Sequence, residues 1–260
     1  MESALAESWL LRNVKMVVEY DGTDYHGFAI QSGLRTVQGE LERAIALVTG
    51  AATRVVGAGR TDAGAHALGQ TVSFKTECRL APIVLRRALN ANLPDDIVVK
   101  VVEDVAEDFH ARRSARRRHY RYSIWNSELP SVWVRRYRYH VPELLDVGAM
   151  DEAASFLVGT RDFACFTYGL ARYLSSGRRR TTIRTLFDAR WRGEPPSIDF
   201  DVVGNAFLPH MIRNMVGSML QVGLRKLTPE QFRGLVERGA EFLSTSTVPA
   251  LGLMLVAVEY

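Results

Sequence analysis

The sequence predicts an α+β protein built from two halves that share one order of elements. Segments with strand-like and helix-like periodicity alternate, the order strand–helix–strand–strand–helix–strand occurs twice, and no Pro/Ser-rich linker separates the two copies. Each copy matches the ferredoxin-like, split βαβ arrangement. We expect the halves, residues 1–108 and 109–260, to join edge to edge into one largely antiparallel sheet, with helices on one face and a central cleft.

Capping and turn signals add to the periodicity in the first half. Thr36 can cap a helix whose apolar side chains recur on one face, and Pro82 suits the first turn of a second helix. Asp21 to Phe28 is rich in turn formers and is predicted to be a loop. Residues 1–13 are expected to be a loose or partly helical extension. The predicted elements are strands at 14–20, 53–58, 68–75 and 97–102, and helices at 37–48 and 82–92.

The second half repeats the order of elements without an obvious repeat of the sequence. Arg118 to Trp125 alternates as a strand does, and Gly193 to Pro196 provides a turn between two further strands. The predicted elements are strands at 118–125, 183–192, 198–203 and 252–260, and helices at 147–158, 207–222 and 229–238.

The composition is that of an ordinary globular protein with an unusual choice of basic residues. The 260 residues carry a formal charge of +4, and only four of the 33 basic residues are lysines, so 29 are arginines. Arginine suits phosphate and base recognition, although a genomic codon bias would also produce it. Cys78 and Cys165 form no disulfide framework, which favours a cytoplasmic location. No stretch is typical of a membrane span, and the first residues do not resemble a signal peptide.

Gly59 to Ala67 is the stretch around which the rest of the chain is organised. It reads Gly-Arg-Thr-Asp-Ala-Gly-Ala-His-Ala and lies between two predicted strands. The nearby guanidinium of Arg60 favours the charged form of Asp62, and a carboxylate with little bulk around it can act as nucleophile, general base or metal ligand. The alternative is a surface turn in which Asp62 bonds its own backbone.

A second candidate lies between Phe109 and Tyr122, where six arginines fall within ten residues and alternate with aromatic residues. Tyr120 and Tyr122 should lie on the same side of a strand, opposite Arg121. Arginines beside aromatic rings suit single-stranded or looped RNA, whose phosphates pair with guanidinium groups and whose bases stack on rings. The alternative is a solvated charged face.

The predicted helix at 207–222 holds a third candidate. Its apolar side chains, including Met211 and Met215, form one arc that is best explained by core packing. His210 falls on the opposite arc and is interpreted as an ordinary hydrogen-bonded histidine. Arg213 lies at the edge of that arc and needs a partner, for which Asp62 is the natural candidate. The fourth stretch, Pro249 to Tyr260, is a closing core strand.

These four stretches together resemble the signature motifs of the TruA family of tRNA pseudouridine synthases, in the family's order. The resemblance implies that Asp62 is the catalytic nucleophile, that Tyr120 lies against the target uracil, and that Arg213 pairs with the nucleophile. It also implies that Leu253 packs against the target base and that Arg60 helps to expel the base partner of the flipped uridine. The residues expected to bind substrate are Arg60, His66, Leu253, Arg116, Arg117 and Arg118.

Three positions depart from the family pattern, and they bear on RNA contacts rather than on the active centre. Ala29 stands where a glutamine is usual, and Pro209 replaces a frequent histidine. The stretch Asp162 to Tyr168, Asp-Phe-Ala-Cys-Phe-Thr-Tyr, lacks the family's common Ser-Phe-Arg.

The resemblance implies an isomerase that converts uridine to pseudouridine at positions 38 to 40 in the anticodon arm of tRNA. It implies a homodimer that holds one tRNA across both subunits, without cofactor, metal or membrane. Two other classes of protein are alternatives. A non-catalytic RNA-binding protein would not need the Asp62 carboxylate, and a metal-dependent nuclease would need a second acidic cluster near it.

Overall fold

The computed structural model describes residues 11–175, 181–238 and 247–260, so most of the predicted extension at 1–13 lies outside the described residues. One ten-stranded sheet runs through the molecule in the order β4-β1-β3-β10-β5-β9-β8-β7, with β2 added on β3 and β6 on β5. All the pairings are antiparallel except β10 with β3 and β5 with β6. The predicted fold class, mixed α/β with a large and mostly antiparallel sheet, is confirmed.

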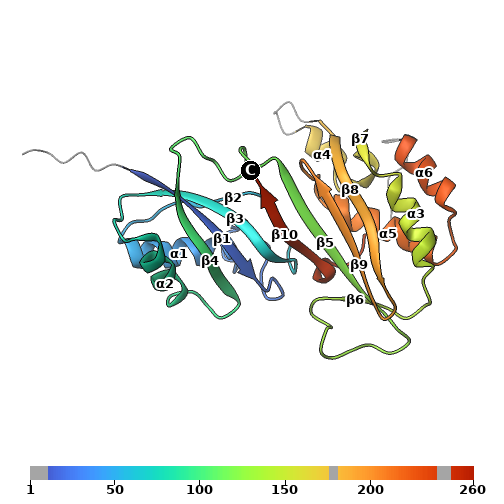
Figure 1. The fold of residues 1–260 in the computed structure, drawn as a ribbon, viewed down its shortest axis with the longest axis horizontal. Helices are drawn as coiled ribbons and strands as arrows, with labels where there is room; N and C mark the ends of the chain where they lie inside the picture. Colours follow the sequence, from blue (N-terminus) through green and yellow to red (C-terminus); the bar gives the residue numbers. More distant parts are fainter. Residues whose placement is uncertain (1–10, 176–180, 239–246) are drawn as a thin grey trace, which may run out of the picture.

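The strand β10 (Leu253–Glu259) occupies the middle of this sheet. It pairs in parallel with β3 (His66–Thr76) on one side and antiparallel with β5 (Arg117–Asn126) on the other. Figure 1 shows it in red between the strands of the two halves, with α1 and α2 at one end of the molecule and α3, α5 and α6 at the other. The last strand in the sequence therefore joins the two halves.

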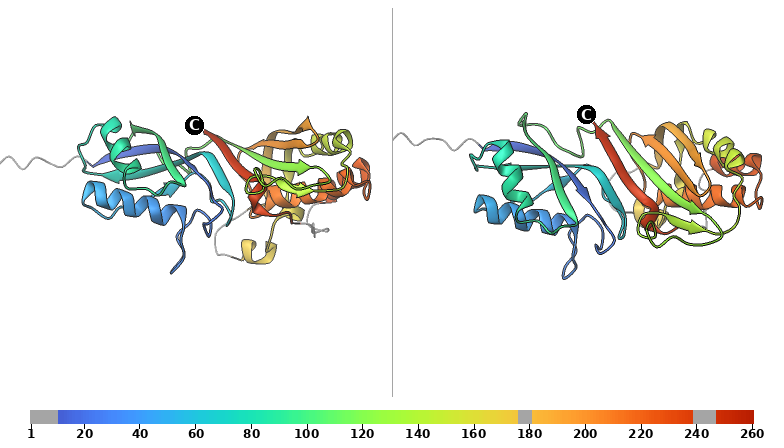
Figure 2. Two further views of the ribbon diagram at one scale, coloured as in Figure 1. Left: turned by 90° about the horizontal axis from the view of Figure 1, so that it is seen from below. Right: turned by 60° about the horizontal axis from the view of Figure 1, so that its bottom comes forward.

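The first half has the strand order β4-β1-β3-β2, which is that of the split βαβ arrangement. Alternate residues of β1 such as Met16 are fully buried, whereas Lys15 and Glu19 point to the other face and pair there with Glu103 and Lys100. One face of these strands is thus apolar, and α1 lies along one side of them in both views of Figure 2. The elements are β1 (Arg12–Tyr20), α1 (Val37–Thr49), β2 (Val56–Gly57), β3, α2 (Pro82–Asn90) and β4 (Ile97–Val105).

The second half has the equivalent order β10-β5-β9-β8, extended by β7. Three short elements, β6, β7 and α4, and the 3₁₀ turns η1 and η3 were not predicted. The elements before β10 are β5, β6 (Tyr139–Val141), α3 (Val147–Ser155), β7 (Gly159–Asp162), η1 (Ala164–Phe166), α4 (Leu170–Leu174), β8 (Ile183–Glu194), β9 (Ser197–Gly204), α5 (Met211–Gly223), α6 (Pro229–Arg238) and η3 (Ala250–Gly252).

Two predicted elements are wrong in extent. The strand predicted at 53–58 shrinks to the two residues of β2, because side chains of α1 bind the backbone at its start. The Val55 N–H donates to Glu42 Oε1 at 2.9 Å, and Gln38 Nε2 donates to the Val55 carbonyl at 3.1 Å. The helix predicted from Phe207 begins at Met211, since His210 adopts a left-handed conformation with φ 58°.

The helix α5 is also buried more completely than its pattern indicated. The predicted apolar arc is buried, but so are Asn214 and Ser218 on the other side. Asn214 Nδ2 donates to the Phe166 carbonyl at 2.8 Å, which satisfies a polar group inside the core. A helix enclosed on all sides is a rigid support for the side chains at its N-terminal end. Within the three described ranges, no helix is long and apolar enough to cross a membrane.

Candidate functional site

The loop that carries Asp62, residues 58–65, is fixed by hydrogen bonds on both sides of the carboxylate. The Thr61 hydroxyl lies 2.8 Å from the Tyr20 hydroxyl, and the Phe28 N–H donates to the Thr61 carbonyl at 3.1 Å. The Gly64 N–H donates to the Tyr25 carbonyl at 3.2 Å. Because the loop is bonded to β1 and to the 21–28 loop, the position of Asp62 is determined before any ligand binds.

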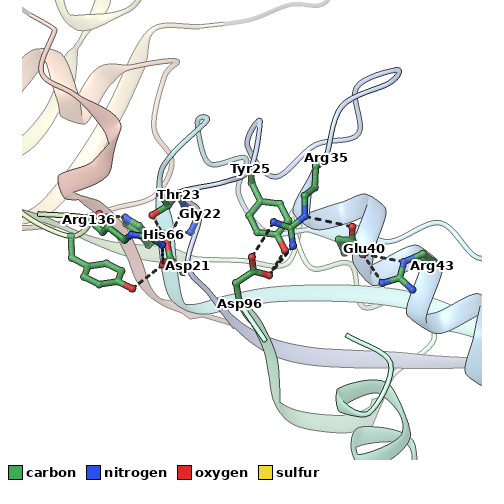
Figure 3. A network of polar contacts seen from close by, with 11 residues as sticks. Asp21, Gly22, Thr23, Tyr25, Arg35, Glu40, Arg43, His66, Asp96 and Arg136 are labelled. Carbon is green, nitrogen blue, oxygen red and sulfur yellow. Dashed lines mark hydrogen bonds and ion pairs between the residues drawn. The ribbon is translucent and has the colours of Figure 1, made fainter. Parts of the chain in front are cut away.

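Two glycines allow the 21–28 loop to approach the Asp62 loop this closely. A Cβ atom on Gly22 would lie 1.9 Å from the Ala65 carbonyl oxygen, so no side chain fits there. Gly27 has φ 90° and its backbone lies against Thr61. Figure 3 shows the polar groups around the 21–28 loop, including the contacts of Asp96 with Tyr25 and Arg35.

The predicted contact between Asp62 and Arg213 is present. Arg213 Nη1 lies 2.9 Å from Asp62 Oδ2, across 151 positions of sequence. Arg213 Nε donates to the Val248 carbonyl at 2.8 Å, so a second bond fixes the guanidinium. The arginine side chain is 15% exposed and the aspartate side chain 30% exposed. The carboxylate is thus held on one side and open to a ligand on the other.

His210 also lies at this site, although sequence reasoning interpreted it as an ordinary hydrogen-bonded histidine. That interpretation is wrong, because Nδ1 is buried with no hydrogen-bond partner among the described residues and Nε2 lies 3.8 Å from Asp62 Oδ2. Burial and, to a smaller extent, Arg213 lower the pKa of His210, while the Asp62 charge opposes them. The ring stacks on Tyr168, with centroids 4.8 Å apart and planes 19° apart. At neutral pH this imidazole is therefore mainly uncharged.

Tyr120 reaches the same site from β5. Its side chain is 6% exposed and packs edge-on against Phe207, with ring centroids 5.1 Å apart. Its hydroxyl faces Gly59, because a Cβ there would lie 2.8 Å from that oxygen. Burial raises the pKa of Tyr120, and the charge of Asp62 acts in the same direction, so the phenol stays protonated.

Leu253 joins the site from the central strand. It pairs with Tyr122 across β10 and β5, and its side chain is buried. Two positions later, Leu255 pairs with Tyr120, so Leu253 and Leu255 lie on the same face of the sheet as the two tyrosines. The structure thus brings Asp62, Arg213, Tyr120 and Leu253 into one region from four segments of the chain.

The arginines predicted to bind substrate fall into two groups. Arg60, Arg116 and Arg117 are exposed, and Arg117 lies over the Phe187 ring at 4.7 Å. Arg118 is buried and donates to three backbone carbonyls, those of Ala58, Arg112 and Asn205. Its donors bind the protein itself, so the structure does not present Arg118 to a substrate and instead uses it to connect three segments.

His66 is likewise enclosed by the protein. Its Nδ1 accepts from the Gly22 N–H at 3.0 Å, and its Nε2 lies 3.0 Å from the Arg136 carbonyl and 3.1 Å from that of Leu251. Two carbonyl neighbours require a proton on Nε2. In Figure 3 the ring lies between Asp21 and Arg136. His66 therefore connects the Asp62 loop with the second half and is not exposed to a substrate in this structure.

Sequence reasoning gave Tyr168 no role. It was noted only as part of a stretch that departs from the family pattern, and the stacking on His210 joins residues that the sequence separates. The sequence offered two signals for such a role. One is the aromatic residue that ends the stretch departing from the family pattern, and the other is Pro209 just before His210.

Comparisons with known proteins identify the family of this chain. A sequence model described as tRNA pseudouridine synthase matches residues 16–112 and 153–260, which include Asp62, Arg213 and Leu253 but not Tyr120. The chain belongs to the tRNA pseudouridine synthase family, whose members are isomerases.

Curated relatives are similar over nearly their whole length. The tRNA pseudouridine synthase A of Acetivibrio thermocellus is 41% identical over 250 residues, covering 96% of this chain and 100% of the relative. That of Roseiflexus castenholzii is 42% identical over 256 residues, covering 96% and 91%. That of Moorella thermoacetica is 40% identical over 249 residues, covering 95% and 99%.

Proposed function

We propose that this protein isomerises uridine to pseudouridine at positions 38 to 40 in the anticodon arm of tRNA, with Asp62 as the nucleophile. The observation that carries the proposal is the half-open carboxylate of Asp62, fixed by Arg213 at 2.9 Å. Family membership and the names of the relatives support tRNA as the substrate.

The reaction requires the glycosidic bond to break, the uracil to turn, and C5 to replace N1 on the ribose. Either attack of Asp62 at ribose C1′ or removal of the 2′ proton toward a glycal starts at the free carboxylate oxygen. In the final step C5 of the rejoined base gives up its proton through the Tyr120 hydroxyl, and N1, which kept the electron pair of the broken glycosidic bond, takes up a proton. The Tyr120 phenol, whose pKa is raised by burial, remains a neutral hydrogen-bonding group beside the turning base.

The other residues position Asp62 and Tyr120 or contact the bound RNA. Arg213 aims the carboxylate and keeps its charge paired while the site is closed to water. Leu253 supplies an apolar contact for the uracil, and exposed Arg60 helps to displace the partner of the flipped base. His66 and Arg118 fix the Asp62 loop from behind, through the carbonyl contacts described above.

Three further parts of the proposal rest on the family resemblance alone. They are a homodimer, one tRNA held across both of its subunits, and catalysis without metal or cofactor; the cytoplasmic location is instead proposed from the two cysteines, Cys78 and Cys165, which form no disulfide framework. A nuclease would need a cluster of metal ligands, and no group of three or more His, Cys, Asp or Glu side chains converges in the part of the chain that the structure describes.

The test is incubation of the protein with a uridine-labelled tRNA transcript, with and without EDTA, followed by nucleoside analysis. Pseudouridine at positions 38 to 40 is the expected product. Binding without conversion would favour a non-catalytic RNA-binding protein, and cleavage that EDTA abolishes would favour a nuclease. Either of those results would contradict the proposal.

A further inference from the structure

We propose that Tyr168 and His210 form a stacking platform for the nucleobase next to the target uridine. The proposal rests on the proposed function, because it takes tRNA as the ligand. It concerns a different base from the one that meets Tyr120, and it gives a role to the stretch ending at Tyr168, which departs from the family pattern.

The first observation is the exposure of an aromatic ring in a fixed position. The Tyr168 side chain is 67% exposed, yet its ring is nearly parallel to that of His210, with centroids 4.8 Å apart. One face of the tyrosine is therefore covered by the imidazole, and the other is left to solvent. The Tyr168 N–H donates to the Pro209 carbonyl at 3.1 Å, and the Thr167 hydroxyl donates to the same oxygen at 3.3 Å. These bonds hold the two rings together.

The second observation is that the His210 ring makes a stacking contact but no hydrogen bond to a described residue. His210 precedes α5 in a left-handed conformation that directs its side chain toward Asp62. Within the part of the chain that the structure describes, its Nδ1 has no hydrogen-bond partner, and its Nε2 is 3.8 Å from Asp62 Oδ2, beyond hydrogen-bond distance. A flat ring that makes no hydrogen bonds and stacks on a second ring presents one continuous aromatic surface.

The third observation is the distance from the reacting centre. His210 stacks on Tyr168 with ring centroids 4.8 Å apart, and its Nε2 lies 3.8 Å from Asp62 Oδ2, so a base on the open face of Tyr168 would belong to a nucleotide near the one whose ribose meets Asp62. The immediate neighbours of the target are one phosphodiester away. Their bases lose a stacking partner when the target uridine flips out, and an aromatic side chain can replace that partner for any base.

The decisive measurement is kcat/KM for pseudouridine formation on three tRNA transcripts: one intact, one abasic 5′ to the target uridine, and one abasic 3′ to it. On intact tRNA, Tyr168→Ala should lower kcat/KM roughly tenfold, the usual effect of losing one base–aromatic stack. Tyr168→Phe keeps the ring and should match the wild type. His210→Asn, which tolerates the left-handed conformation, should show part of the loss.

On one of the two abasic tRNAs, the difference between wild type and Tyr168→Ala should vanish, which identifies the stacked neighbour. Because Tyr168 is exposed, the thermal midpoint of the variant should be unchanged; Tyr168→Leu serves in its place if the alanine variant unfolds. A loss that persists on both abasic tRNAs, or no loss on intact tRNA while the wild type makes pseudouridine, overturns the platform and leaves the proposed function standing. A wild type that makes no pseudouridine on any tRNA overturns both.

Discussion

Arg213 Nη1 meets Asp62 Oδ2 at 2.9 Å, and this contact joins a loop of the first half to a buried helix of the second. Among the described residues, no side chain forms a hydrogen bond with Asp62 Oδ1. This second carboxylate oxygen is therefore the one that can react with a substrate. A carboxylate anchored through one oxygen has a fixed direction, which a loop residue by itself would lack.

Replacing Asp62 by Asn should abolish the isomerase while preserving the fold. The amide is close to the carboxylate in size and can still contact Arg213, but it cannot act as nucleophile or base. We expect activity to fall by several orders of magnitude, with little change in tRNA affinity. Single-turnover assays and a binding titration would measure both quantities, and residual activity within tenfold of wild type would refute the assignment.

Removal of Arg213 should be more harmful than removal of both charges. Arg213→Met leaves Asp62 half-buried without its partner and should destabilise the protein by about 1–3 kcal/mol, with loss of activity. Adding Asp62→Asn should recover much of the stability and none of the activity. Urea unfolding of the four proteins forms a double-mutant cycle, and strictly additive free energies would contradict the coupling.

The arginine-rich segment should separate into RNA-binding and structural members. Replacing exposed Arg116 and Arg117 by Ala should weaken tRNA binding and reduce the dependence of log Kd on log salt concentration by roughly 0.7 to 0.9 per lost phosphate contact. The matched control is Arg118→Met, which removes a buried guanidinium bonded to carbonyls. It should lower the thermal midpoint instead. An unchanged salt slope for the double variant would show that Arg116 and Arg117 belong to a solvated charged face and do not bind RNA.

Close approach of the two loops should make Gly22 intolerant of a methyl group. A Cβ there would lie 1.9 Å from a backbone oxygen of the Asp62 loop, so Gly22→Ala must displace that loop and should reduce both stability and kcat. Gly234→Ala is the control, since Gly234 lies inside α6 with open space around it and the change should stabilise by about 0.5–1 kcal/mol. Equal behaviour of the two variants would show that the loops are not in contact.

Stability at acid pH should depend on Asp201, which is remote from Asp62 in the sequence and nearly buried. Burial alone would raise its pKa, but hydrogen bonds from His119 and Arg121 lower it to about 2, below the ordinary value of 3.8. A lowered pKa stabilises the folded state above the ordinary value, and this stabilisation, up to about 2 kcal/mol, is lost as pH falls from 3.8 through 2. Urea unfolding of wild type and Asp201→Asn should therefore differ at pH 7 and converge near pH 2. A difference in unfolding free energy that stays constant from pH 7 to pH 2 would disprove the link between Asp201 ionisation and acid stability.

Much of the fold could be predicted because its signals are local. Thr36 caps α1 by accepting from the Gly39 N–H at 3.3 Å, as its position indicated, and Pro82 begins α2. The alternation of Tyr120, Arg121 and Tyr122 placed both tyrosines on the buried side. The boundary at residue 108/109, the central cleft and the roles of the site residues stay predictions.

What the sequence could not reveal depends on partners that lie far away along the chain. Arg118 resembles its exposed neighbours in every local respect, and only the carbonyls of Ala58 and Asn205 make it structural. His66 is fixed by Leu251 from the other half in the same way. The short elements β6 and β7 have too few residues for periodicity to show, and they form because β5 and β8 offer edges for pairing.

The central place of β10 also sets the timing of assembly during synthesis. A ribosome completes β3 and β5 well before it reaches Leu253, by roughly 6 to 25 seconds for β5 at usual elongation rates. During that interval both strands that will flank β10 present unpaired edges. The Leu251 carbonyl, which accepts a hydrogen bond from His66 Nε2 beside the Asp62 loop, has not yet been made. The active centre therefore forms only after β10 has been synthesised, so a nascent chain should carry no isomerase activity until this strand has left the exit tunnel.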